Sequence, residues 1–250
     1  MKVLSIAGYH HSGKTTTTVE LIKELKRRGY KVVSIKDIHS EKFTMEKQET
    51  NSWKHWEASG DVVFARGLNE TYQIWHHSLS LNEMLEHLSA DYVVIEGMKE
   101  ASLPRIICAE NKDQLKELID GSVFAISGKF ADTHTKYQNL PVLRSVTEIK
   151  ELADLVEQKV FEVLPLPKME CCGECGLSCK EMVTEILAGR RSRNDCKTDR
   201  NLDIQVKFDG KKFNIVPFVQ RTFKDLITAY LQNLKGYEKG KKIEITIEEK

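Results

Sequence analysis

The stretch from Gly8 to Thr15 constrains this chain more than any other, because it reads Gly-Tyr-His-His-Ser-Gly-Lys-Thr and matches the pattern G-x-x-x-x-G-K-[ST]. An apolar run at residues 2–7 precedes it, and a segment with apolar residues at helical spacing, residues 14–28, follows it. A strand, a glycine-rich loop and a helix in this order form the phosphate-binding loop, or P-loop, of nucleotide-binding proteins. The sequence therefore predicts a bound nucleoside triphosphate with Mg²⁺.

The residues of this loop have separate expected tasks. Its glycines let backbone N–H groups converge on phosphate oxygens, and the helix that follows adds the positive end of its dipole. We expect Lys14 to reach the β- and γ-phosphates and the hydroxyl of Thr15 to bind Mg²⁺. The residues expected to contact the nucleotide are Gly8, Ser12, Gly13, Lys14, Thr15, Thr16 and Asp37.

Two carboxylates stand where apolar, strand-like runs end. Asp37 follows residues 31–36, and Glu96 ends residues 91–96. Parallel sheets bind ligands at the carboxyl ends of their strands, so we expect both carboxylates near the P-loop, as Mg²⁺ ligands or as groups that orient a water. Glu96 joins Lys14 as an expected catalytic residue. For Asp37, an ordinary acid at a strand end is an equally good interpretation.

Up to about residue 163, short apolar runs alternate with longer amphipathic segments, which predicts an α/β fold with a mainly parallel sheet. Further strands are expected at residues 31–36, 62–65, 72–75, 91–96, 105–109 and 122–127, with a helix at 81–88. The Pro-Leu-Pro run at 165–167 predicts a linker. We therefore expect three domains: a P-loop NTPase domain at 1–163, a cysteine-rich metal domain at 168–200, and a small α+β unit at 201–250.

Five of the six cysteines gather in one short segment, and a sixth, Cys108, lies in an apolar run typical of an inert buried thiol. The spacing Cys172-x2-Cys175-x3-Cys179-x16-Cys196 supplies four thiolates, which either zinc or a [4Fe–4S] cluster accepts. The compact glycine-containing loop and the helix expected at 180–188 favour iron–sulfur, with zinc as the alternative.

The C-terminal segment changes character. Residues 202–208 alternate apolar and polar, Asp209-Gly210 supplies a hairpin turn, and residues 211–216 continue the pattern. A helical stripe at 219–234 and a second alternation at 243–247 follow. This order predicts a small ββαβ unit.

Charge and hydropathy exclude some classes of partner. The chain has 38 basic and 37 acidic residues, a net charge of +1, so nothing favours nucleic acid or an anionic membrane. The apolar run at residues 2–7 is too short for a signal peptide or a membrane span. We expect a cytoplasmic protein.

Four segments together resemble one family. They are residues 8–17, Ile-Lys-Asp-Ile-His at 35–39, Asn-Ser-Trp-Lys-His-Trp-Glu-Ala-Ser-Gly at 51–60, and Ile-Glu-Gly-Met-Lys at 95–99. In this order and spacing, about the first 160 residues resemble molybdopterin-guanine dinucleotide biosynthesis protein B, the MobB family. The family usually has histidine where Asp37 follows Lys36, and Asp-Ser where this chain has Asn51-Ser52. The cysteine segment is similar to the four-cysteine iron–sulfur domain of corrinoid iron–sulfur proteins.

The resemblance implies a GTP-binding accessory protein, usually a homodimer, that assists the guanylyltransferase partner attaching GMP to molybdopterin, with slow GTP hydrolysis. Guanine preference does not follow from the residues: the Asn-Lys-Asp-Gln run at 111–114 lacks the final carboxylate of a guanine-reading motif and is interpreted as a solvated loop. Two alternatives stay open. One is an ATP-dependent synthetase of the dethiobiotin synthetase type, and the other is a nucleotide-gated adaptor or metallochaperone.

Overall fold

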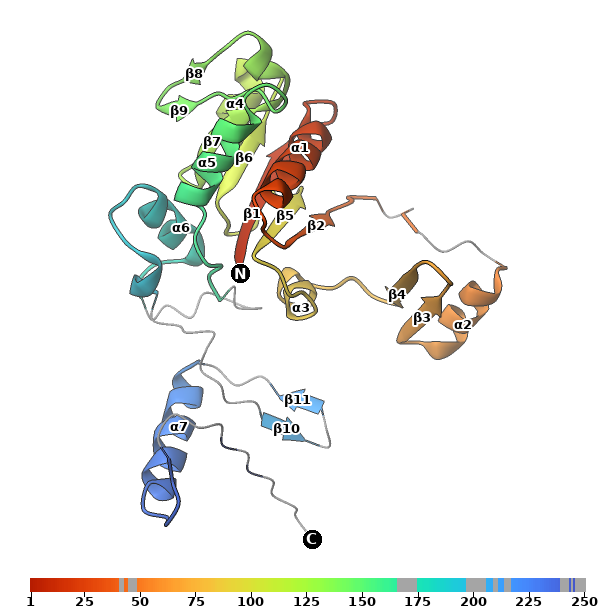
Figure 1. The fold of residues 1–250 in the computed structure, drawn as a ribbon, viewed down its shortest axis with the longest axis vertical. Helices are drawn as coiled ribbons and strands as arrows, with labels where there is room; N and C mark the ends of the chain where they lie inside the picture. The colour runs from red at the N-terminus through yellow and green to blue at the C-terminus, as the bar shows by residue number, and fades with distance from the viewer. Residues whose placement is uncertain are drawn as a thin grey trace. The chain divides into compact units, whose positions relative to one another are not determined.

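A computed structural model of the protein describes residues 1–40, 43–44, 49–165, 175–196, 206–208, 211–213, 217–238, 243 and 245. The chain divides into two compact units, Met1–Cys196 and Lys197–Lys250 (Figure 1). This division differs from the three expected domains, because the described part of the cysteine segment, residues 175–196, belongs to the first unit.

The first unit is built on a five-stranded sheet in the order β2-β5-β1-β6-β7, and all four strand pairs are parallel. Its strands are β1 (Lys2–Gly8), β2 (Val32–Lys36), β5 (Tyr92–Glu96), β6 (Arg105–Cys108) and β7 (Val123–Ser127). Each coincides with an expected strand to within two residues. The predicted α/β fold with a mainly parallel sheet is confirmed.

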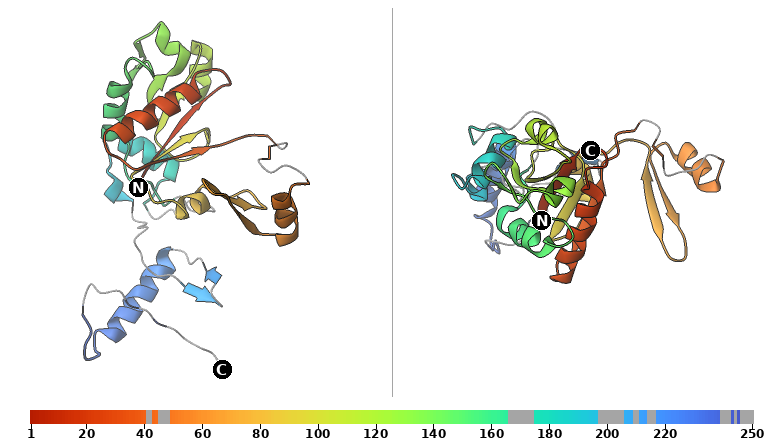
Figure 2. Two further views of the ribbon diagram at one scale, coloured as in Figure 1. Left: turned by 45° about the vertical axis from the view of Figure 1, so that its right-hand side comes forward. Right: turned by 90° about the horizontal axis from the view of Figure 1, so that it is seen from above.

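Helices cover both faces of this sheet, because the central strand β1 buries side chains on each side. Leu4 and Ile6 of β1 pack with apolar residues of α1 (Lys14–Arg27) and α5 (Ile149–Lys159). Figure 2 shows α1 running along the sheet. Val3 points to the opposite face and packs with Leu85 of α3 (Leu81–Glu86). Successive residues of a strand point to opposite faces, so both faces of β1 are apolar.

Helix α4 (Lys112–Leu118) and the short elements after β7 complete this unit. Asn111, expected in a solvated loop, instead caps α4: its side-chain Oδ1 accepts hydrogen bonds from the backbone N–H groups of Asp113 and Gln114 at 3.1 and 3.0 Å. The elements after β7 are the 3₁₀ helix η1 (Gly128–Asp132) and the strands β8 (Lys136–Tyr137) and β9 (Leu140–Pro141).

A separate antiparallel hairpin lies between β2 and β5 in the chain. Its strands, β3 (Val62–Arg66) and β4 (Thr71–Trp75), confirm the two expected there. Helix α2 (Asn51–Ser59), which was not expected, precedes them and begins after Thr50, whose hydroxyl accepts a 3.2 Å hydrogen bond from the Trp53 backbone N–H.

The described cysteine segment packs on the P-loop domain through α6 (Cys179–Leu187), with the 3₁₀ helix η2 (Arg193–Asp195) after it. Met182 and Val183 of α6 form one buried cluster with Leu164, which precedes the expected linker. The capping box between Ser178 and Glu181 fixes the start of α6, which confirms the helix expected there to within one residue.

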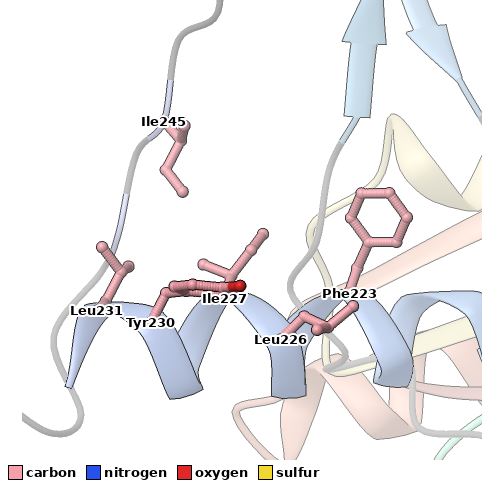
Figure 3. Close-up of a pocket in the computed structure, with 6 residues that line it drawn as sticks. All are labelled: Phe223, Leu226, Ile227, Tyr230, Leu231 and Ile245. Carbon is pink, nitrogen blue, oxygen red and sulfur yellow. The ribbon is translucent and has the colours of Figure 1, made fainter. Parts of the chain in front are cut away.

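The second unit contains the hairpin β10 (Val206–Phe208) and β11 (Lys211–Phe213), followed by α7 (Pro217–Leu231). The expected turn Asp209-Gly210 lies outside the described residues. Of the expected last strand, Ile243 and Ile245 are described, and neither is in a strand. Ile245 and an apolar face of α7 line an open hollow of about 330 Å³ (Figure 3). The residues that line it are Phe223, Leu226, Ile227, Tyr230, Leu231 and Ile245. No helix among the described residues combines the length and the apolar character needed to cross a membrane.

Candidate nucleotide-binding site

The two glycines of the P-loop stand where a side chain would not fit. Gly8 has φ of 156°, and a Cβ there would lie 2.0 Å from the carbonyl oxygen of Cys108. Gly13 has φ of 100°, and a Cβ there would lie 2.9 Å from the Cα of Gly128. The loop therefore rests directly on the ends of β6 and β7. Only glycine combines these backbone angles with this close approach.

Internal hydrogen bonds hold the loop in shape. The buried Ser12 hydroxyl donates to the carbonyl of Tyr9 at 2.8 Å, and the Lys129 backbone N–H donates to the carbonyl of Ser12 at 3.1 Å. Lys14 Nζ also donates to the Tyr9 carbonyl, at 2.6 Å. These hydrogen bonds fix the backbone of the loop and place Lys14 Nζ beside it.

The N-terminus of α1 is open for an anion. Gly13 occupies the N-cap position and has no side chain to satisfy the first N–H groups of the helix. Thr15 and Thr16, the next expected contacts, are exposed, whereas the Thr17 hydroxyl turns inward and donates to the carbonyl of Gly13 at 3.0 Å. Free N–H groups at a helix N-terminus favour phosphate.

Thr15 and Glu96 meet beside the P-loop. The Thr15 hydroxyl donates to Glu96 Oε1 at 2.9 Å, across 81 residues of chain. Glu96 is 9% exposed and is the last residue of β5, the strand next to β1. A hydroxyl and a carboxylate oxygen side by side are the ligands that Mg²⁺ prefers, so these residues fit the expected ion.

Asp37 supports the turn that follows Glu96. Its Oδ2 accepts a 3.1 Å hydrogen bond from the Met98 backbone N–H and lies 2.9 Å from His39 Nε2. Gly97 has φ of 112°, and a Cβ there would lie 2.8 Å from the Cβ of Asp37. Asp37 therefore lies at the expected edge of the sheet, the carboxyl ends of the strands. One of its oxygens stabilises the turn at Gly97 and Met98. Its metal and nucleotide contacts stay predictions.

Lys36 is a residue of this site that was not among the expected ones. Its Nζ lies 3.1 Å from Glu96 Oε1, the same oxygen that accepts the Thr15 hydroxyl. The two residues are register partners at the ends of β2 and β5. The sequence places Lys36 at a strand end but does not give the strand order, which is what brings it to Glu96.

Cys108 lies beneath the loop as an inert thiol. It is fully buried, its Sγ lies 3.4 Å from the Thr17 hydroxyl, and burial raises the pKa of the thiol to about 12. It stays protonated at neutral pH, as expected for a structural cysteine.

Three of the four expected cluster ligands contact the same apolar cluster. Cys175, Cys179 and Cys196 all pack against the buried cluster that includes Met182 and Val183. Cys172 lies outside the described residues. Among the residues that are described, no group of three or more His, Cys, Asp or Glu side chains is arranged to hold a metal ion.

The sequence model described as molybdopterin guanine dinucleotide synthesis protein B matches residues 3–129 of the chain. The chain belongs to the MobB family. The matched residues include the P-loop, Asp37 and Glu96 and end before the cysteine segment. The expected family is therefore confirmed for the part of the chain that forms the candidate site.

Relatives extend the likeness. A putative molybdopterin-guanine dinucleotide biosynthesis adapter protein of Methanocaldococcus jannaschii is 27% identical and matches 99% of this chain and 98% of its own length. The adapter protein of Haemophilus influenzae is 30% identical over 62% of this chain and 87% of its own length. The crystal structure of Bacillus subtilis MobB superimposes with a TM-score of 0.52 at 22% identity, covering 65% of this chain and all of that one, and shows a common fold.

Proposed function

We propose that this protein is a GTP-binding adapter of molybdenum cofactor biosynthesis that assists formation of molybdopterin guanine dinucleotide. The observation that carries the proposal is the 2.9 Å contact of Thr15 with Glu96 beside an open helix N-terminus, in a chain of the MobB family. Relatives named as adapters of this biosynthesis support the pathway. The proposed partners are GTP, molybdopterin and the guanylyltransferase, and the proposed location is the cytoplasm.

In this proposal the chain holds the nucleotide by positioning and by charge. Backbone N–H groups of the loop and Lys14 bind the β- and γ-phosphates, and Thr15 and Glu96 hold Mg²⁺, which neutralises phosphate charge. Water accepts the γ-phosphoryl group, with GDP and phosphate as the products. Because the site contributes mainly positioning and charge, turnover without a partner is slow.

Competition between GTP and ATP for the purified full-length chain tests this proposal. Tighter binding of GTP with Mg²⁺ is the expected result. A clear preference for ATP would instead favour an ATP-dependent synthetase of the dethiobiotin synthetase type. Binding of GTP with no hydrolysis over hours would favour a nucleotide-gated adaptor or metallochaperone.

The proposal includes a [4Fe–4S] cluster held by Cys172, Cys175, Cys179 and Cys196, with zinc as the alternative. The last three pack against one apolar cluster and so lie in the same part of the first unit. Cys179 opens α6, where helix N–H groups favour a thiolate. Iron, sulfide and zinc analysis of anaerobically purified protein distinguishes the two metals. Stoichiometric zinc without acid-labile sulfide would replace the iron–sulfur assignment.

The proposal also includes a homodimer. The strands β3 and β4 pair with each other and with no other strand among the described residues, and they expose Phe64 and Tyr72. An isolated two-stranded hairpin is marginally stable and has unpaired edges, so a second copy would stabilise it. Light scattering after size-exclusion chromatography tests this. A monomer at micromolar concentration would contradict it.

A further inference from the structure

Lys36 lies beside Glu96, one of the two residues proposed to hold Mg²⁺. Its ammonium lies 3.1 Å from Glu96 Oε1, and the Thr15 hydroxyl lies 2.9 Å from that same oxygen. The lysine and the proposed metal ion would thus both depend on the charge of one carboxylate. Two cations beside one carboxylate repel each other, so a bound Mg²⁺ ion would weaken the contact of the ammonium with Glu96.

The side chain of Lys36 is free to move. It is 58% exposed, whereas that of Glu96 is 11% exposed. An ion pair with one exposed partner contributes little to stability, and the lysine stem is long and flexible. Displacement from Glu96 is therefore a small change for the folded chain.

The γ-phosphate is a suitable acceptor for the displaced ammonium. Lys36 ends β2 at the carboxyl edge of the sheet, on the flank of the P-loop where Thr15 and Glu96 mark the metal. A Mg²⁺ ion held by Thr15 and Glu96 would neutralise phosphate charge on this flank, so we expect the γ-phosphate here. Two other described basic side chains already have partners: Lys129 Nζ lies 2.5 Å from Glu110, and His39 Nε2 lies 2.9 Å from Asp37.

We propose that Lys36 binds the γ-phosphate and makes the site prefer a nucleoside triphosphate to a diphosphate. The inference rests on the proposed nucleotide binding. Lys14 does not supply this preference, because a P-loop lysine also reaches the β-phosphate and therefore binds a diphosphate as well. A triphosphate carries more negative charge than a diphosphate, and Lys36 is the cation that this extra charge attracts.

The test compares the affinities of GDP and of a non-hydrolysable GTP analogue, both with Mg²⁺, for the full-length protein by titration calorimetry. In Lys36→Met, the analogue should bind about tenfold more weakly while GDP binds unchanged, since a charge-assisted hydrogen bond to phosphate is lost. Lys36→Arg should restore part of the preference. The control is Lys99→Met, an exposed lysine after β5, which should change neither affinity.

Equal losses for both nucleotides in Lys36→Met, or no loss for either, would overturn the inference while leaving nucleotide binding intact. Wild-type protein that binds neither nucleotide would overturn the proposed function as well. Thermal melting of Lys36→Met establishes that the variant is folded. An unchanged melting temperature is expected, because the ion pair contributes little.

Discussion

Lys180 Nζ lies 3.0 Å from Asp120 Oδ2, and this ion pair fastens helix α6 to the loop that leads into β7. The same carboxylate accepts hydrogen bonds from the guanidinium of Arg105 and, at 2.6 Å, from the hydroxyl of Ser122. Arg105 also donates to the Lys99 carbonyl, three residues beyond Glu96. The cysteine segment is thus joined by contiguous contacts to the loop that follows Glu96 at the candidate site.

Asp120→Asn should destabilise the first unit at neutral pH. Burial acts to raise the pKa of Asp120, but hydrogen bonds from Ser122, Arg105 and Lys180 outweigh it and hold the pKa below the ordinary value of 3.8. Stability from this carboxylate is therefore present above about pH 4 and is lost as the pH falls through the lower folded-state pKa.

Thermal unfolding of wild type and Asp120→Asn at pH 7 and near pH 3 measures this. We expect the free energy of unfolding to fall by about 2 kcal/mol at pH 7, because the buried Arg105 loses its negatively charged partner. The difference between the two proteins should be smaller near pH 3. Asp113→Asn, in an exposed pair with Lys116, should have little effect at either pH. If the difference in stability between wild type and Asp120→Asn grows toward acid pH, the Asp120 carboxylate does not stabilise the first unit in this way.

Gly8→Ala should unfold the P-loop. The new Cβ would lie 2.0 Å from the Cys108 carbonyl at a backbone φ of 156°. Both the clash and the backbone strain act against folding, so we expect the free energy of unfolding to fall by at least about 2 kcal/mol. Gly29→Ala is the matched control, since its φ is also positive at 92° but nothing lies within 4 Å. If urea titrations show that both variants lose the same free energy of unfolding, then residue 8 does not lie close to the Cys108 carbonyl.

Glu96→Gln should remove most of the effect of Mg²⁺ on nucleotide affinity. The amide keeps the shape and accepts the Thr15 hydroxyl but has no charge to hold the ion. Titration with a fluorescent GTP analogue, with Mg²⁺ and with EDTA, measures the ratio of affinities. We expect that ratio to approach unity in this variant and to stay as in wild type in Glu100→Gln, whose side chain is exposed. A ratio unchanged in Glu96→Gln would place the metal elsewhere.

Cys175→Ala should lose the proposed cluster and loosen residues 175–196, because metal–thiolate bonds couple ligand binding to folding. Anaerobic reconstitution followed by iron and sulfide analysis measures the loss, and GTP binding should survive it. Cys171→Ala removes the fifth cysteine of the segment and should leave iron and sulfide unchanged. Full iron and sulfide content in Cys175→Ala would exclude Cys175 as a ligand.

The strands and α1 could be predicted because their signals are local. Apolar runs in parallel strands buried on both faces, and the helical spacing after Lys14, do not depend on distant parts of the chain. The approach of Thr15 to Glu96 could also be anticipated in outline, since parallel strands bring their carboxyl ends to one edge.

Contacts set by strand order and by packing could not be predicted in this way. Lys36 reaches Glu96 because β2 lies next to β5, although the hairpin β3–β4 separates the two strands in the chain. The prolines at 165–167 predict a linker that isolates the cysteine segment, yet Lys180 pairs with Asp120 and Thr184 lies against Gly121. A local proline signal carries no information about such distant partners.

The most direct test of nucleotide binding at the P-loop is calorimetric titration of GTP with Mg²⁺ into the wild-type protein and into Lys14→Ala. Lys14 is the residue of the loop whose positive charge binds the β- and γ-phosphates. Its removal should therefore weaken GTP binding by about tenfold or more and leave the melting temperature unchanged. Lys23→Ala, an exposed lysine on the same helix 2.7 Å from Glu20, should bind as wild type does. Equal GTP affinity in wild type and Lys14→Ala would contradict the assignment of this P-loop as the nucleotide site.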